Sequence, residues 1–190
     1  MLLSLFQLIL KLTGWRFVRK IPADIKSYVM VGAPHTSNYD FIPAMGVAYH
    51  LRPNAKFVIK SDWLKFPMGP IFKALGAIGV NRELIKQGKV ESSTDLFANL
   101  FKEHKNLVLM ISPEGTRSPV EDWKSGFYYI AQKAGVPIVL GYADYAKKEF
   151  GLGMVIYPSE FESDMKKISD FYRNVQGCNP SNFKLDKRFK

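Results

Sequence analysis

The chain is organised around one stretch, His35-Thr36-Ser37-Asn38-Tyr39-Asp40, which joins two apolar segments. The segment before it, Tyr28-Val29-Met30-Val31, has the β-branched and aromatic composition of a buried strand. Gly32-Ala33-Pro34 ends that strand, because proline cannot continue a central ladder. The segment after it, residues 41–51, predicts a helix that Ser37 or Asn38 can cap. The order is therefore strand, loop, helix, with His35 on the loop.

His35 and Asp40 can form a base and its orienting carboxylate. Within a continuous helix, side chains five residues apart would point about 140° away from each other. With His35 on the loop and Asp40 in the first helical turn, the carboxylate can accept from one imidazole nitrogen and leave the other as a base. The positive end of the helix favours the ionised carboxylate. There is no obvious Ser or Cys nucleophile beside them, so the substrate would supply the nucleophile. The alternative, a loop histidine that merely caps the helix, stays open on this short motif alone.

Three further blocks follow along the chain. They are Gly76-Ala77-Ile78-Gly79-Val80-Asn81-Arg82, Ser112-Pro113-Glu114-Gly115-Thr116-Arg117-Ser118 and Gly135-Val136-Pro137-Ile138-Val139. In this order the four blocks resemble the glycerolipid acyltransferases typified by 1-acylglycerol-3-phosphate acyltransferase, over about residues 29–140. The resemblance implies a single α/β domain with a mixed, mainly parallel sheet flanked by helices, in agreement with the alternation of strand and helix patterns.

The resemblance also implies a reaction and the residues that perform it. His35 would deprotonate the hydroxyl of a lysophospholipid, first of all 1-acylglycerol-3-phosphate, and Asp40 would stabilise the imidazolium. The acyl group would come directly from acyl-CoA or acyl-carrier protein, with no other cofactor and no acyl-enzyme. Pro137 would lie on the acyl-donor side. The matching residues for the acceptor's glycerol phosphate are Arg82, Glu114, Gly115 and Arg117.

The ends of the predicted strands carry cations and hydrogen-bond donors. Residues 56–60 form a predicted strand that ends at Lys60, and residues 77–80 form another that ends before Arg82. Ligands of open α/β sheets bind at strand ends. After the strand at residues 107–111, Gly115 permits a turn that brings Glu114 and Arg117 toward one point, and Thr116 adds a hydroxyl. We expect a phosphate clamp there, although Lys60 and Arg82 can also be plain surface charges.

The composition restricts the partners. Of 190 residues, 47% are hydrophobic and 14% aromatic, which excludes a disordered chain. The net charge of +10 favours an anionic membrane surface, a phosphorylated substrate or nucleic acid. Basic and aromatic residues do not alternate along one stripe and no nucleic-acid motif occurs, so we expect no nucleic-acid partner. One cysteine, Cys178, and three scattered histidines predict neither a disulfide nor a metal site, and indicate a reducing compartment.

The first twenty residues have the pattern of an interfacial anchor. Residues 1–13 are mostly apolar but too short to span a bilayer, and their polar positions Ser4, Gln7 and Lys11 share one narrow helical face. Aromatic residues alternating with basic ones follow at 15–20. We therefore divide the chain into an anchor, residues 1–20, and an acyltransferase domain, residues 21–190, on the cytoplasmic face of a membrane. A helix packed on the core and a signal peptide are the alternatives, although no basic region precedes the apolar run and no small-residue cleavage site follows it.

The rest of the chain predicts mostly packing. The aromatic cluster at residues 123–129 is more typical of a core than of an acyl groove. We expect a β-hairpin between residues 147–150 and 154–157, an amphipathic helix over residues 163–174, and a loose basic tail at residues 183–190. Two other functions remain open at this stage: a non-catalytic lipid-binding module, and an acyltransferase whose acceptor is a lyso-aminolipid.

Overall fold

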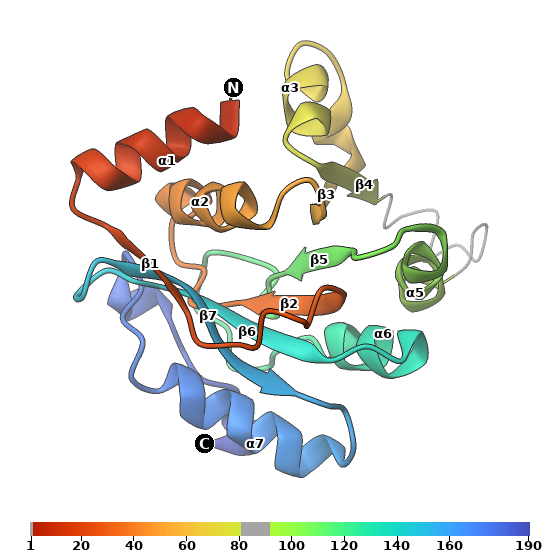
Figure 1. Cartoon of the computed structure of the whole chain (residues 1–190). Coiled ribbons are helices and arrows are strands. Elements are labelled where there is room, and N and C mark those ends of the chain that lie inside the picture. The colour runs from red at the N-terminus through yellow and green to blue at the C-terminus, as the bar shows by residue number, and fades with distance from the viewer. Residues whose placement is uncertain (1, 81–91) are drawn as a thin grey trace.

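The computed structural model describes residues 2–80 and 92–190, which form one sheet covered by helices (Figure 1). The sheet has seven strands in the order β1-β7-β6-β2-β5-β3-β4. Strands β2 to β6 run parallel to one another, while β7 is antiparallel to β6 and β1 is parallel to β7. The strands are β1 (Arg16–Arg19), β2 (Tyr28–Gly32), β3 (Ala55–Lys60), β4 (Ala77–Val80), β5 (Val108–Ile111), β6 (Ile138–Asp144) and β7 (Glu149–Ile156). The predicted mixed, mainly parallel sheet is confirmed.

Helices cover both faces of the sheet. On one face lie α1 (Leu2–Leu12), α2 (Phe41–Leu51) and α3 (Gly69–Ala74), and on the other lie α5 (Ser93–Glu103), α6 (Gly126–Ala134) and α7 (Phe161–Tyr172) (Figure 1). Four short 3-10 segments complete the described part of the chain: η1 (Asn38–Asp40), η2 (Ser61–Leu64), η3 (Pro180–Asn182) and η4 (Lys187–Phe189). The predicted helix at residues 41–51 is confirmed with the same bounds.

The strands divide their side chains between two cores. On β2, Val29 and Val31 point into the core beneath α5, α6 and α7, whereas Tyr28 and Met30 point into the core beneath α1 and α2. This alternation follows from the period of two along a strand. Strand β2 is buried on both faces at the centre of the sheet, so its end is a rigid base for the loop that carries His35.

Three local predictions have clear outcomes. The aromatic cluster is core, as expected: Trp123, Phe127 and Tyr128 are all buried. The hairpin at residues 147–157 is wrong, because residues 149–156 form the single strand β7 and the turn lies between β6 and β7. Gly151 lies within this strand. Because it has no side chain, the carbonyl of Val18 on β1 can approach it closely. The tail at residues 183–190 is not loose; it is hydrogen-bonded to residues 121–123.

Candidate active site

Parallel strands bring the predicted loops to one edge of the sheet. Strands β2, β5 and β3 are neighbours, so their carboxyl ends lie together. His35 follows β2, Lys60 ends β3, and Gly115 to Arg117 follow β5. All of these residues line one cavity of about 1090 Å³. Arg82 lies outside the described residues.

The His35 loop is closed by hydrogen bonds onto Asp40. Oδ2 of Asp40 accepts from the backbone N–H of Thr36 at 2.6 Å and of Ser37 at 2.8 Å. Ser37 caps η1 and forms a capping box with Asp40. Of the two predicted caps, Ser37 and Asn38, the structure uses Ser37. Nδ1 of His35 lies 3.4 Å from the same Oδ2. The ring is one-third exposed, and its other nitrogen, Nε2, is left for a substrate.

The surroundings of Asp40 favour its charged form. Burial alone raises the pKa of this carboxyl, but the contacts with His35, Ser37, Thr36 and Tyr145 together outweigh burial and hold the pKa below its usual value. The net effect is a buried anion beside the imidazole. An anion in that place can fix the ring orientation and stabilise an imidazolium.

Glu114 does not face the cavity as expected. Its side chain is 4% exposed, and Oε2 accepts from the backbone N–H of His35 at 2.7 Å. Burial raises the pKa of Glu114 to about 8; the His35 N–H opposes this rise and the charge of Asp40 adds to it. Glu114 and Arg117 therefore do not converge on one point, because the turn at Gly115, with φ of 66°, directs one inward and the other outward. Glu114 therefore links the loop after β5, called the second loop, to the loop after β2 that carries His35, called the first loop.

Arg117 is exposed at the cavity, and no carboxylate in the described part of the chain pairs with it. Thr116 lines the same wall, and its Oγ1 accepts from Ser118 N–H, which leaves the Thr116 hydroxyl proton for another acceptor. Lys60 also lines the cavity but is 2.7 Å from Asp62. Among the described residues that line the cavity, Arg117 is therefore the cation without a carboxylate partner.

The remaining cavity wall is apolar. Phe41 on α2 packs edge-on against Phe6 of α1, Phe57 of β3 and Phe72 of α3, with ring centroids 5.6 to 6.3 Å apart. All four rings line the cavity. Its volume is slightly above the range typical of small-molecule sites, about 300–1,000 Å³. No sequence pattern indicates this wall, because its residues come from four separate elements.

Pro137 is not part of this site. It precedes β6, and Val29 N–H near the start of β2 donates to its carbonyl at 3.0 Å. Since β2 and β6 are parallel, Pro137 lies at the amino end of the sheet, opposite the edge that carries His35. Pro137 therefore starts a strand away from this cavity, and its role on the acyl-donor side stays a prediction.

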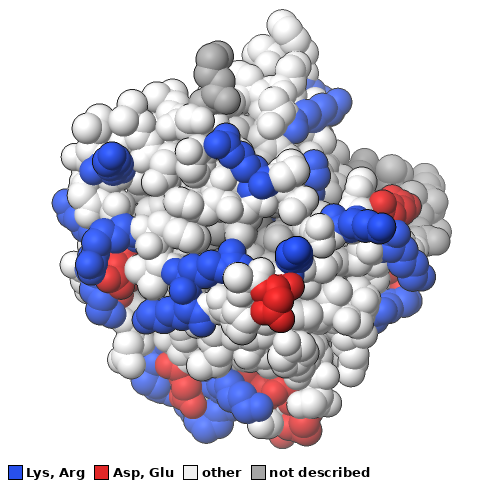
Figure 2. Space-filling model, viewed as in Figure 1, with Lys and Arg blue, Asp and Glu red and all other residues white. Residues whose placement is uncertain are grey.

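Helix α1 packs on the core with one face and is exposed on another, so the predicted membrane anchor stays a prediction. Leu10 is buried and Phe6 packs on α2, so one face belongs to the core. Leu5, Leu8 and Leu12 on another face are 52%, 51% and 77% exposed. Figure 2 shows that the upper part of the molecule, where α1 and α3 lie in Figure 1, is largely uncharged with separate Lys and Arg side chains. In the described part of the chain, no helix has the length and apolarity needed to cross a membrane.

The segment after α1 differs from the predicted anchor flank. Arg16 to Arg19 form the edge strand β1 of the sheet, and Arg16 pairs with Glu149. Trp15 packs against Tyr145, and Phe17 stacks on His50 with centroids 3.8 Å apart. Strand β1 pairs with the edge of β7. In this position Trp15 and Phe17 pack against the protein.

The comparison with known families decides the class. A family model described as Acyltransferase matches residues 8–140. The chain belongs to this family. It is therefore an O-acyltransferase of the glycerolipid acyltransferase group. No curated protein and no solved structure gives a significant match.

The matched region ends before several residues that contact the site. Tyr145, at the end of β6, influences the pKa of Asp40, and Asn179 donates to Thr36. Neither stands in a recognisable motif, and each reaches the loop only through the folded chain. Sequence reasoning missed both.

Proposed function

We propose that the chain transfers a fatty acyl group from an acyl thioester to the hydroxyl of 1-acylglycerol-3-phosphate, forming phosphatidic acid. One observation carries this proposal: His35 and Arg117, which has no carboxylate partner among the described residues, line the same cavity, whose remaining wall is largely apolar. A base, a phosphate-binding cation and a hydrocarbon surface are the groups that such an acceptor requires.

In the proposed reaction, Nε2 of His35 takes the proton of the acceptor hydroxyl. The acceptor oxygen attacks the thioester carbonyl carbon, and a tetrahedral intermediate forms. The C–S bond then breaks, and the leaving thiolate takes the proton from the imidazolium. Asp40 stabilises that imidazolium from the Nδ1 side. The enzyme returns to its starting state without an acyl-enzyme.

The acceptor phosphate would lie against Arg117. Arginine offers paired N–H donors that match phosphate oxygens, and the Thr116 hydroxyl and the amides of the same loop add neutral donors. Lys60, although paired with Asp62, adds positive charge on the other side of the cavity. Gly115 keeps the loop compact at its positive φ. Arg82 belongs to this proposal by sequence alone.

The acyl chains would occupy the apolar wall around Phe41. A long hydrocarbon gains about 0.8 kcal/mol for each buried CH₂ group, so this wall can hold one chain while the polar end lies near His35. The donor would be acyl-CoA or acyl-carrier protein, with no other cofactor required by the reaction.

The exposed faces of α1 and of the segment at residues 63–71 would rest on an anionic membrane. Phe66 is 91% exposed and Trp63 58%, and Trp63 also lines the cavity. Lys65 and Lys73 accompany them. Lysines near an anionic surface contribute about 1 kcal/mol each, so the mouth of the cavity would face the lipid that supplies the acceptor, on the cytoplasmic side.

The test is an acceptor screen with one labelled acyl-CoA and one labelled acyl-carrier protein. We expect product with 1-acylglycerol-3-phosphate, and a loss on the order of 10²–10⁴ in rate for His35→Ala. A His104→Ala variant is the matched control, since His104 ends α5 away from the cavity. Product only with a lyso-aminolipid would move the proposal to that acceptor. Retention of about half the rate by His35→Ala would refute the mechanism.

A further inference from the structure

The chain beyond α7, residues 175–190, is called the C-terminal strap here because it contacts both active-site loops. On the first loop it reaches Thr36, which is 1% exposed and directly follows His35. Asn179 donates its backbone N–H to Thr36 Oγ1 and its Nδ2 to the Thr36 carbonyl, each at 3.1 Å. Asn182 Nδ2 lies 3.4 Å from the same carbonyl.

The strap packs on this loop without a gap. A Cβ added to Gly177 would lie 2.9 Å from Thr36 Oγ1 and 3.0 Å from the Pro34 side chain. The carbonyl of Gln176 accepts from Tyr145 N–H at 2.9 Å, which ties the strap to the turn after β6. The loop that carries His35 is therefore held by residues more than 140 positions later in the sequence.

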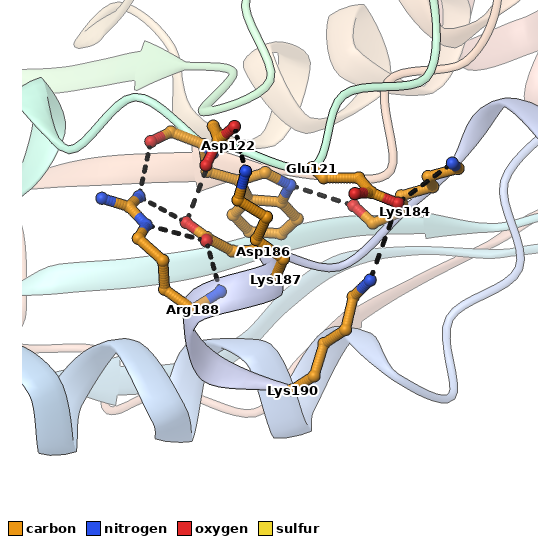
Figure 3. A network of polar contacts seen from close by, with 8 residues as sticks. Glu121, Asp122, Lys184, Asp186, Lys187, Arg188 and Lys190 are labelled. Atoms are coloured by element: carbon orange, nitrogen blue, oxygen red, sulfur yellow. Dashed lines mark hydrogen bonds and ion pairs between the residues drawn. The ribbon is translucent and has the colours of Figure 1, made fainter.

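The strap also holds the end of the second loop (Figure 3). Asp186 accepts from the Trp123 N–H at 3.3 Å, and Arg188 donates to the Trp123 carbonyl at 2.9 Å. Trp123 Nε1 donates to the Lys184 carbonyl at 3.0 Å. The next residue, Lys124, donates its N–H to the carbonyl of Pro113, which stands beside Glu114. Both loops are thus joined to one segment, and that segment lies outside the region matched to the family.

We propose that Asn179 is a positioning residue for acyl transfer, which acts through Thr36 to hold His35 and Asp40 in their relative places. The proposal rests on the proposed role of His35 as base. Its physical basis is a chain of contacts. Asn179 donates to two acceptors of Thr36, its Oγ1 and its carbonyl, and Thr36 in turn donates its N–H to Asp40 Oδ2. A shift of Thr36 therefore moves the carboxylate that faces the imidazole.

The first measurement is the steady-state kinetics of Asn179→Ala with labelled palmitoyl-CoA and a monodisperse 1-acylglycerol-3-phosphate. Misplacement of reacting groups by about 1 Å can cost about 10²-fold in rate, so we expect kcat to fall by about tenfold or more while the acceptor KM stays within about twofold. Asn174→Ala is the matched control, because Asn174 is exposed just before the strap and makes no side-chain hydrogen bond within the described residues. A kcat within about twofold of wild type, or an effect confined to KM, would overturn the proposal.

The second measurement is amide hydrogen exchange, which does not depend on the substrate. The Thr36 and Ser37 amides are protected by Asp40 Oδ2, and Asn179→Ala should speed their exchange by about tenfold while Val29 and Val31 in the core exchange as before. Equal acceleration at all four amides would mean general destabilisation and would overturn a positioning role. If these exchange results hold but His35→Ala remains active, the proposed base is wrong and the strap still holds the loop.

The third measurement tests whether Asn179 acts through Asp40. In an Asp40→Asn background, Asn179→Ala should add less than about twofold to the loss of kcat, because residues of one network are not additive. Full additivity would overturn the proposal. Thr36→Val breaks the other contact, since it removes the Oγ1 that accepts from the Asn179 backbone N–H; it should also lower kcat, and Thr36→Ser, which keeps the hydroxyl, should retain most of the rate.

Discussion

The two loops at the edge of the sheet differ in what they leave available. In the loop from His35 to Asp40, the carboxylate is occupied by two backbone N–H groups and the imidazole, so only one ring nitrogen is open. In the loop from Glu114 to Arg117, the carboxylate is turned inward and the guanidinium outward. In the proposed function, the first loop would transfer a proton and the second would hold an anion. Glu114 shows that one loop also supports the other.

The largest effect should come from breaking the first loop. Asp40→Asn removes the charge opposite the imidazole, and loss of base assistance costs on the order of 10²–10⁴ in rate. We expect kcat to fall within that range and the acceptor KM to change by less than about threefold, as measured by initial rates with labelled acyl-CoA.

Asp170→Asn is the control for this change, because Asp170 is on α7 and, within the described residues, pairs with its near neighbours Lys166 and Arg173. An equal loss in both variants would mean that general stability, not the orientation of His35, determines the rate.

The link between the loops should appear in the pH dependence of stability. The pKa of Glu114 is raised from 4.5 to about 8 in the folded chain, so the folded state holds this proton more tightly than the unfolded state. The contribution to stability is therefore complete below about pH 4.5 and is lost as the pH rises through about 8. Each pKa unit corresponds to about 1.4 kcal/mol.

Urea unfolding of wild type and Glu114→Gln across this range measures that contribution. Glutamine keeps an oxygen that can accept from His35 N–H but cannot ionise. We expect the free energy of unfolding of the variant, relative to wild type, to rise by about 2–4 kcal/mol from pH 4.5 to pH 8. Parallel curves would show that the carboxyl titrates normally and does not link the loops as described.

A smaller effect separates membrane contact from both loops. Replacing Leu5, Leu8 and Leu12 of α1 with serine removes apolar surface that is exposed and does not line the cavity. Burial of a whole leucine side chain contributes about 1.5–3 kcal/mol, so binding to anionic vesicles should weaken by at least about tenfold in a sedimentation assay. Turnover of a monodisperse acceptor should be unchanged.

Leu96→Ser on α5, the other side of the sheet, is the matched control for vesicle binding. If the triple variant binds vesicles as wild type does, the exposed face of α1 is not the contact. If it is insoluble, these leucines belong to the core.

The parts of the fold that could be predicted depend on local signals. The strand before His35, the cap at Ser37, the helix from Phe41 to Leu51 and the turn at Gly115 are each encoded by neighbouring residues, and all are confirmed. The shared edge of β2, β3 and β5 followed from a general rule for parallel sheets. Local patterns and that rule were enough to bring His35, Lys60 and Arg117 together.

The errors concern contacts made at long range. Glu114 accepts a hydrogen bond from the backbone N–H of His35 on another loop, and no sequence pattern near Glu114 indicates that partner. The basic tail is fixed by Trp123, a residue more than sixty positions earlier. Hydropathy and charge along the chain carry no information on such pairs.

The most direct test of the central claim is a comparison of Arg117→Gln and His35→Ala with two acceptors, 1-acylglycerol-3-phosphate and a monoacylglycerol that lacks the phosphate. A charged hydrogen bond contributes about 1.5–3 kcal/mol, so Arg117→Gln should raise the KM of the phosphate acceptor by about tenfold or more. It should leave the monoacylglycerol unaffected, whereas His35→Ala should lower kcat on both acceptors. Equal damage by Arg117→Gln to both acceptors, or a His35→Ala enzyme that keeps its rate on either, would contradict the division between a loop for chemistry and a loop for phosphate.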